Sequence, residues 1–240
     1  MSHPPGFHGK IPSQGDFISR RLPWDFIECW DNWLQEGISA AREALGAQWL
    51  QTYLVAPVWR FLITPGGCGS HGWLGLWFPS VDRVGRHFPF TVTVPVAAQQ
   101  AHPGLLFSQE AWLARVEATA LRALDPRISL EQLDNVLAAM PLTLPDTRLP
   151  SSSQPLATRL FTLPDHLHPE ALASIVPMAT SSPRQPVSYW HTWGTDRIPA
   201  CYYISDRLPE RALFPAYLTG DWSRHGIRPD TLVPTGPETR

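Results

Sequence analysis

An apolar stripe with helical spacing is the first strong pattern along the chain. It begins after Pro23 and recurs about every 3.6 residues until Gly46. Its positions are Phe26, Ile27, Trp30, Trp33, Leu34, Ile38, Ala41 and Leu45. Proline suits the first turn of a helix, and glycine suits the position after the last turn. The pattern therefore predicts an amphipathic helix over 23–45, followed by a short helix over 47–54 that ends before Pro57.

Three strand-like segments follow, and they are rich in aromatic and β-branched residues. Residues 58–64 and 73–78 are separated by a glycine-rich stretch, which predicts an antiparallel hairpin. Residues 88–96 alternate between apolar and other side chains and form the third predicted strand. Because proline cannot donate to a strand ladder, Pro89 and Pro95 predict a position at the edge or the end of the sheet.

Two more helices are predicted before the middle of the chain. Residues 104–125 carry apolar side chains along one face, which predicts one long amphipathic helix. Residues 128–140 predict another, and Ser129 with Gln132 has the spacing of a capping box at its start.

The second half of the chain differs in composition. Residues 141–186 are rich in proline and serine, which predicts a loop-rich excursion. Some apolar residues within it indicate that it packs against the body of the protein: Leu160, Phe161, Leu163, Ile175 and Val176. Residues 187–193 and 200–204 predict two further strands, and residues 209–218 predict a helix. We expect the tail over 223–240 to be frayed.

Strands in two groups, separated by helices, favour a mixed sheet with helices packed on its faces. The predicted hairpins make that sheet largely antiparallel, so a regular Rossmann winding is not expected. The predicted fold class is therefore α/β (α+β), a single three-layer domain over residues 1–222 that includes the excursion at 141–186.

Composition narrows the class of function. The chain has 240 residues, 43% of them hydrophobic, and a formal net charge of −2, which gives no electrostatic case for nucleic acid or an anionic membrane. Cys29, Cys68 and Cys201 lie far apart, which argues against a disulfide framework and a cysteine zinc site. With neither a secretory signal nor an apolar run that could span a bilayer, we expect a soluble cytoplasmic protein without membrane insertion.

Short motifs that resemble enzyme sites fail on spacing. Gly9-Lys10 resembles a phosphate-binding loop, but Pro4 and Ile11 stand where that loop needs a glycine and a hydroxyl. The glycine-rich stretch around Cys68 resembles a nucleophile elbow, but it lacks the glycine two positions after the nucleophile. We interpret Cys68 as a structural loop residue.

Isolated catalytic residue types carry no further signal. Ser80, Asp82 and His87 include the three types of a hydrolytic triad, but their crowding is no evidence for one, since triads are recognised by geometry. His166 and His168 form a close pair with no second ligand cluster of matching spacing. No metal and no cofactor is expected, and a small hydrolase using Ser80 or Cys68 remains an alternative.

The densest polar cluster runs from Pro79 to Phe90. Arg83 and Arg86, three positions apart, could together hold a phosphate or a carboxylate. In the competing interpretation Asp82 pairs with one of them and stabilises the turn. A phosphopeptide-binding module using the two arginines is thus a further alternative.

Several spaced motifs, in one order, resemble the TagF (ImpM) family of proteins associated with bacterial type VI secretion. They are GFHGKIPSQGDFISRRLP, WDNWL, APVWRF and PSVDRVGRHFPF, and the resemblance is strongest over residues 6–96. It continues more loosely through VSYWHTW and RLPERALF to Trp222. The chain departs from the family pattern at His191, where an aromatic residue is usual, and at Arg207, which precedes Leu-Pro in place of glycine.

The resemblance implies a non-enzymatic cytoplasmic accessory protein that restrains the secretion apparatus after translation. It implies a forkhead-associated scaffold protein of the same system as partner, and no cofactor. The GFHGKIPSQGDF stretch is then a strand, a turn at 12–15 and a lead-in to the first helix. We place the hypothesised contact face at Lys10, Asp16, Arg83 and Arg86, and Arg20 and Arg21 are also candidate surface contacts.

Overall fold

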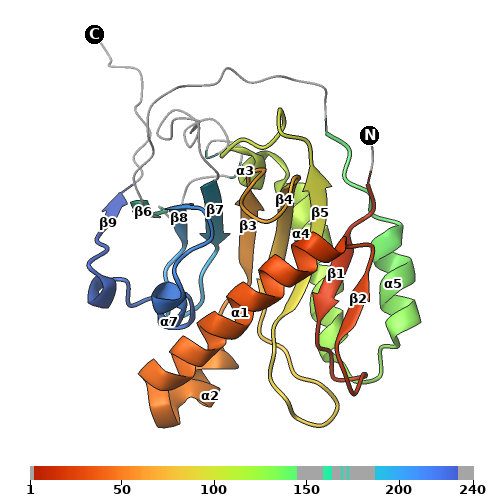
Figure 1. The fold of residues 1–240 in the computed structure, drawn as a ribbon, viewed down its shortest axis with the longest axis horizontal. Coiled ribbons are helices and arrows are strands. Elements are labelled where there is room, and N and C mark those ends of the chain that lie inside the picture. The colour runs from red at the N-terminus through yellow and green to blue at the C-terminus, as the bar shows by residue number, and fades with distance from the viewer. Residues whose placement is uncertain (1–2, 145–158, 164–168, 170–171, 173–186, 232–240) are drawn as a thin grey trace.

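One extended β-sheet organises the computed structural model, which describes residues 3–144, 159–163, 169, 172 and 187–231. In the described residues the sheet has nine strands in the order β2-β1-β5-β4-β3-β7-β8-β6-β9 (Figure 1). Every neighbouring pair is antiparallel except β6 and β9, which are parallel. The strands are β1 (Gly6–Gly9), β2 (Ile18–Arg20), β3 (Trp59–Ile63), β4 (Gly72–Phe78), β5 (Phe90–Val96), β6 (Arg159–Thr162), β7 (Val187–Thr192), β8 (Cys201–Asp206) and β9 (Pro229–Thr231).

Helices cover both faces of this sheet. On one face lie α1 (Trp24–Leu45), the 3-10 turn η1 (Gly46–Gln48), α2 (Trp49–Tyr53), η3 (Arg211–Leu213) and α7 (Phe214–Thr219), with η4 (Ser223–His225) after them. On the other face lie α3 (Leu105–Ser108), α4 (Glu110–Leu121), η2 (Arg122–Leu124) and α5 (Leu130–Ala138). The α1 helix runs diagonally across the strands, and α4 lies behind them (Figure 1). This three-layer arrangement confirms the predicted fold class.

The two cores differ in chemistry because side chains alternate along each strand. On β4, Trp73 and Trp77 face α1, whereas Leu74 and Leu76 face the layer of α3 to α5. The α1 side is dominated by aromatic rings, with Trp30 between Phe61 at 4.5 Å and Trp33 at 4.9 Å, measured between ring centroids. The other side is mainly aliphatic.

The first helix matches its prediction closely. It begins at Trp24 after Pro23 and ends at Leu45, and Gly46 adopts a positive φ of 50° as the C-cap. The capping box of α5 is also present, with Ser129 and Gln132 each accepting from the other's backbone N–H. The long helix predicted over 104–125 is instead divided into α3 and α4, because Gln109 leaves the helical region at φ −104° and ψ 22°.

The third predicted strand lies inside the sheet, so the edge position inferred from its prolines is wrong. β5 pairs with β4 along its whole length and with β1 over Phe90–Thr93. Pro89 precedes the strand, and Pro95 lies beyond the last residue that β1 reaches. On the β1 side, therefore, neither proline removes a ladder hydrogen bond, because β1 is shorter than β5.

Two segments in the second half of the chain form elements that the composition did not predict. The proline-rich excursion at 141–186 contributes strand β6, and Leu160, Phe161 and Leu163 are buried as expected. Ile175, Val176, His166 and His168 lie outside the described residues. Residues 223–231, which we expected to be frayed, form η4 and β9.

A disulfide joins α1 to the glycine-rich β3–β4 loop, which the sparse cysteines did not predict. Cys29 and Cys68 have Cα atoms 5.7 Å apart, within the usual range for a disulfide. Cys201 is a buried free thiol on β8. The bond closes a loop that contains all of β3 and α2.

Protein purified without reductant should therefore show one reactive thiol in denaturant and three after reduction. Closing a loop of this size stabilises a fold by roughly 2–4 kcal/mol, so reduction should lower the melting temperature. Cys29→Ser should melt at the same temperature with and without reductant. Three thiols in the unreduced protein would contradict the assignment.

A buried polar cluster lies between β3, β7 and α4. The Arg60 guanidinium pairs with Glu110 and with Glu117, and its side chain is 4% exposed. His191, which pairs with Arg60 across the strands, is fully buried, and neither ring nitrogen has a hydrogen-bond partner in the described structure. Burial, and secondarily the charge of Arg60, holds the pKa of His191 well below its ordinary value of 6.5.

Because of this depressed pKa, the folded protein should become less stable in mild acid. Below pH 6.5 the unfolded chain protonates His191 and the folded chain does not, so the free energy of unfolding should fall by about 1.4 kcal/mol per pH unit from this group. In His191→Phe this part of the pH dependence should vanish, as urea melts at pH 5.5 and 7.5 would show. His71→Phe, at an exposed histidine, is the matched control. Equal pH dependence in wild type and His191→Phe would contradict the account.

Candidate functional site

Two loops meet at one end of the sheet. The first connects β1 to β2 and contains Lys10 to Phe17, and the second connects β4 to β5 and contains Pro79 to Pro89. Because Gly9 on β1 stands opposite Phe90 on β5, the chain leaves one strand next to the point where it enters the other. The longer second loop extends beyond the sheet, beside the turn between β1 and β2 (Figure 1).

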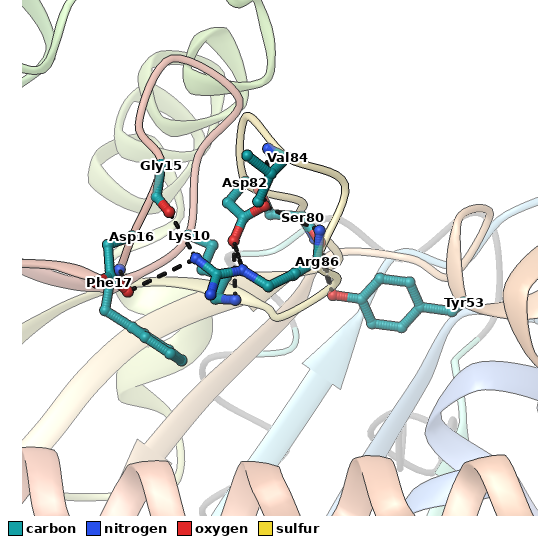
Figure 2. A network of polar contacts seen from close by, with 9 residues as sticks. All are labelled: Lys10, Gly15, Asp16, Phe17, Tyr53, Ser80, Asp82, Val84 and Arg86. Atoms are coloured by element: carbon teal, nitrogen blue, oxygen red, sulfur yellow. Dashed lines mark hydrogen bonds and ion pairs between the residues drawn. The ribbon is translucent and has the colours of Figure 1, made fainter.

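A single carboxylate lies at the centre of this junction. Asp82 Oδ1 accepts the backbone N–H groups of Val84 at 3.0 Å and of Arg86 at 2.9 Å. Asp82 Oδ2 accepts Lys10 Nζ at 3.0 Å and Arg86 Nε at 2.7 Å (Figure 2). The carboxylate therefore fixes the turn of its own loop and ties it to the first loop.

The Asp82 side chain is fully buried, and its pKa depends both on this burial and on its hydrogen bonds. Burial alone disfavours the charged form and raises the pKa. The hydrogen bonds from Arg86, Lys10 and Val84 outweigh that effect and hold the pKa of Asp82 well below its ordinary value. Asp82 is consequently ionised throughout the physiological range.

Lys10 is buried at 6% exposure, so its expected place on the surface is wrong. It is the only lysine in the chain. Its ammonium group approaches the Phe17 ring to 4.8 Å from the centroid, in addition to the bond with Asp82. A long stem that runs beneath the loops, with its charge paired inside, makes Lys10 a support for this site.

The other three predicted residues surround Asp82 at the surface. Arg86 Nη2 donates to the backbone oxygen of Gly15 at 2.6 Å and lies 3.8 Å from the Asp16 carboxylate. The backbone N–H of Arg83 donates to the backbone oxygen of Gln14 at 2.8 Å. The structure thus brings all four predicted residues together, and the expected local pairing of Asp82 with an arginine is present with Arg86.

Sequence reasoning missed several contributors to the site. The Tyr53 hydroxyl donates to the backbone oxygen of Ser80 and accepts its backbone N–H, both at 3.0 Å, which anchors the start of the second loop to α2 (Figure 2). Phe17 packs edge-on against Phe88 at 4.8 Å between ring centroids. Tyr53 carried no sequence signal, because its partner is a main chain 27 residues away.

The residues of the hydrolase alternative are not assembled into a triad. Ser80 is buried, and its hydroxyl has no hydrogen-bond partner in the described structure. The Asp82 carboxylate is occupied by Lys10 and Arg86, and the Cys68 sulfur is bonded to Cys29.

Among the described residues there is neither a metal-binding cluster nor a membrane-spanning helix. No cluster of three histidine, cysteine or acidic side chains there has the geometry to bind a metal ion. Among the same residues, no helix combines the length and the apolar character needed to cross a bilayer.

The Arg20 and Arg21 side chains both lie near Asp134 of α5, which ties the β2 edge to that helix.

Comparison with known protein families shows which family this chain belongs to. Residues 6–140, which include both loops, match the model of the TagF N-terminal domain, described as type VI secretion system-associated. The chain belongs to the TagF family. No curated protein matches it.

One solved structure is similar to this chain over nearly all of its length. The crystal structure of PA0076 from Pseudomonas aeruginosa PAO1 has 34% sequence identity and a TM-score of 0.71. The alignment covers 98% of this chain and 100% of that one. The chain is therefore similar to PA0076 along its full length, the strands β6 to β9 included.

The burial of the only lysine gives a direct test of the site. An amine-acylating reagent should modify Lys10 far more slowly in native protein than in urea-unfolded protein. Asp82→Asn should accelerate the modification and lower the free energy of unfolding by about 3–5 kcal/mol, since a buried charge loses its partner. Asp125→Asn, which breaks a pair at the exposed Arg127, should leave the Lys10 rate unchanged. Equal Lys10 rates in native and unfolded wild type would refute the buried pair.

Proposed function

We propose that this protein is a non-enzymatic cytoplasmic accessory protein of a bacterial type VI secretion system. It restrains the apparatus after translation by binding a forkhead-associated scaffold protein of the same system. The observation that carries the proposal is the TagF match over residues 6–140. The restraint and the scaffold partner are what the family resemblance implies for this chain.

The site geometry supports a binding role. We define the two-loop surface as the exposed side chains of Asp16, Phe17, Arg83, Val84 and Arg86. A positioned loop on a rigid sheet is a common place for recognition, and arginine is enriched at interface centres. The proposed contact face therefore includes Asp16, Arg83 and Arg86, with Lys10 supporting them from beneath.

The proposed cytoplasmic location affects whether the bond between Cys29 and Cys68 is present in the cell. The cytoplasm keeps most thiols reduced, so Cys29 and Cys68 would exist there as a neighbouring dithiol. Lys10, Asp82 and Arg86 hold the two-loop surface without help from that bond. Binding experiments should therefore be run with reductant present.

The proposal predicts saturable binding to the scaffold protein of the same secretion cluster in a calorimetric titration. Reversing both charges in Arg83→Glu/Arg86→Glu should weaken binding at least about tenfold, since like-charge contacts are costly. Arg197→Glu, at an exposed arginine outside both loops, is the control. In cells, excess wild-type protein should reduce type VI secretion, and excess double variant should not.

Two outcomes would count against this function. Absence of scaffold binding by wild type would remove the mechanism. A double variant that is folded and binds as tightly as wild type would show that the contact face lies elsewhere. Thermal melts of each variant separate lost binding from lost stability.

A further inference from the structure

Within the two-loop surface, one apolar side chain stands out. Val84 is 66% exposed and lies in the turn that the Asp82 carboxylate closes. Figure 2 shows Val84 beside Asp82, above the network that holds Lys10 and Arg86. Gly85, next to it, has a positive φ of 88°, so the turn geometry itself depends on glycine there.

The turn is held before any partner arrives. Asp82 accepts the N–H groups of Val84 and Arg86, and the Gly85 N–H donates to the Asp82 backbone oxygen at 3.0 Å. The Arg83 N–H is bound to Gln14 on the other loop. Binding through this turn would therefore cost little ordering of the backbone, and pre-organisation of this kind favours affinity.

The two arginines of this surface differ in how many of their guanidinium donors are already hydrogen-bonded within the protein. Arg86 already uses Nε on Asp82 and Nη2 on Gly15. The Arg83 guanidinium lies against Gly15, and no carboxylate of the described residues pairs with it. Arg83, which directly precedes Val84, thus has guanidinium N–H groups that are available to bind a carboxylate of another molecule.

A phosphate group would meet an unfavourable arrangement here. A dianionic phosphate calls for several converging charged donors, whereas Lys10 is buried and Arg86 already donates from Nε to Asp82 and from Nη2 to Gly15. The Asp16 carboxylate, 3.8 Å from Arg86 Nη2, would repel it. A single carboxylate matches one guanidinium fork, and it is monoanionic.

We propose that the two-loop surface recognises an acidic protein surface, with Val84 entering an apolar recess and Arg83 pairing with an aspartate or glutamate beside it. Recognition is independent of phosphorylation. Arg86 and Lys10 act as positioning residues that hold the turn. This inference rests on the proposed function, because it names the chemistry by which the scaffold protein is recognised.

The test measures affinity for the purified scaffold protein, once dephosphorylated and once phosphorylated, with reductant present. Wild type should bind both forms equally. Val84→Asp should weaken binding at least about thirtyfold, as expected for a central anchor. Arg83→Glu should weaken it about tenfold or more, and Arg83→Lys should recover part of the loss, since the charge returns without the fork.

Matched variants separate recognition from folding. Val55→Asp and Arg197→Glu alter an exposed valine and an exposed arginine outside the two loops, and both should bind as wild type does. Slow acylation of Lys10 in Val84→Asp and Arg83→Glu shows that the network beneath the turn is intact. Millimolar inorganic phosphate should not compete with the scaffold more than an equal ionic strength of chloride does.

The results that overturn the inference differ from those that overturn the function. If wild type binds the scaffold but Val84→Asp and Arg83→Glu bind equally well, the recognition chemistry is wrong and the proposed function stands. Binding that requires phosphorylated scaffold, or specific competition by phosphate, would favour a phosphate reader instead. If wild type binds neither form of the scaffold, the proposed function fails and this inference fails with it.

Discussion

The ion pair between Lys10 and Asp82 ties the N-terminal hairpin to the loop between β4 and β5. Its partners are 72 residues apart, and the side chains are 7% and 0% exposed. Charges removed from water in this way are retained only when their remaining hydrogen-bonding capacity is satisfied. Here the Asp82 carboxylate has four donors, and the cost of burying it is offset within a single junction.

This junction explains why the β1–β2 hairpin, although short, has a defined position. β1 contributes only Gly6–Gly9 to the sheet, and a ladder of that length holds a hairpin weakly. The Lys10–Asp82 pair lies directly beyond its end, and the pairing of Arg20 and Arg21 with Asp134 lies at its other edge. Charged contacts thus add to the pairing of β1 with β5 on both sides of this short element.

The sequence allowed prediction where the causes are local. The α1 stripe, its flanking proline and glycine, and the α5 capping box each depend on neighbours within one or two turns, and the structure confirms them. The interior place of β5 escaped prediction because it depends on how far β1 extends, which is a property of another strand. The Cys29–Cys68 bond and strand β6 were missed for the same reason, since each needs a partner distant in the chain.

The candidate site was predictable in its membership but not in its roles. Polar motifs on two connections singled out Lys10, Asp16, Arg83 and Arg86, and antiparallel pairing of β1 with β5 brought them together. Which side chain is buried depends on the shape of the charged group. The compact ammonium of Lys10 donates to one carboxylate oxygen and lies against an aromatic face, whereas a guanidinium would bring five donors to the same place. The arginines therefore lie on the outside of the junction, where the guanidinium of Arg83 can reach another molecule, and the one lysine holds the junction together from within.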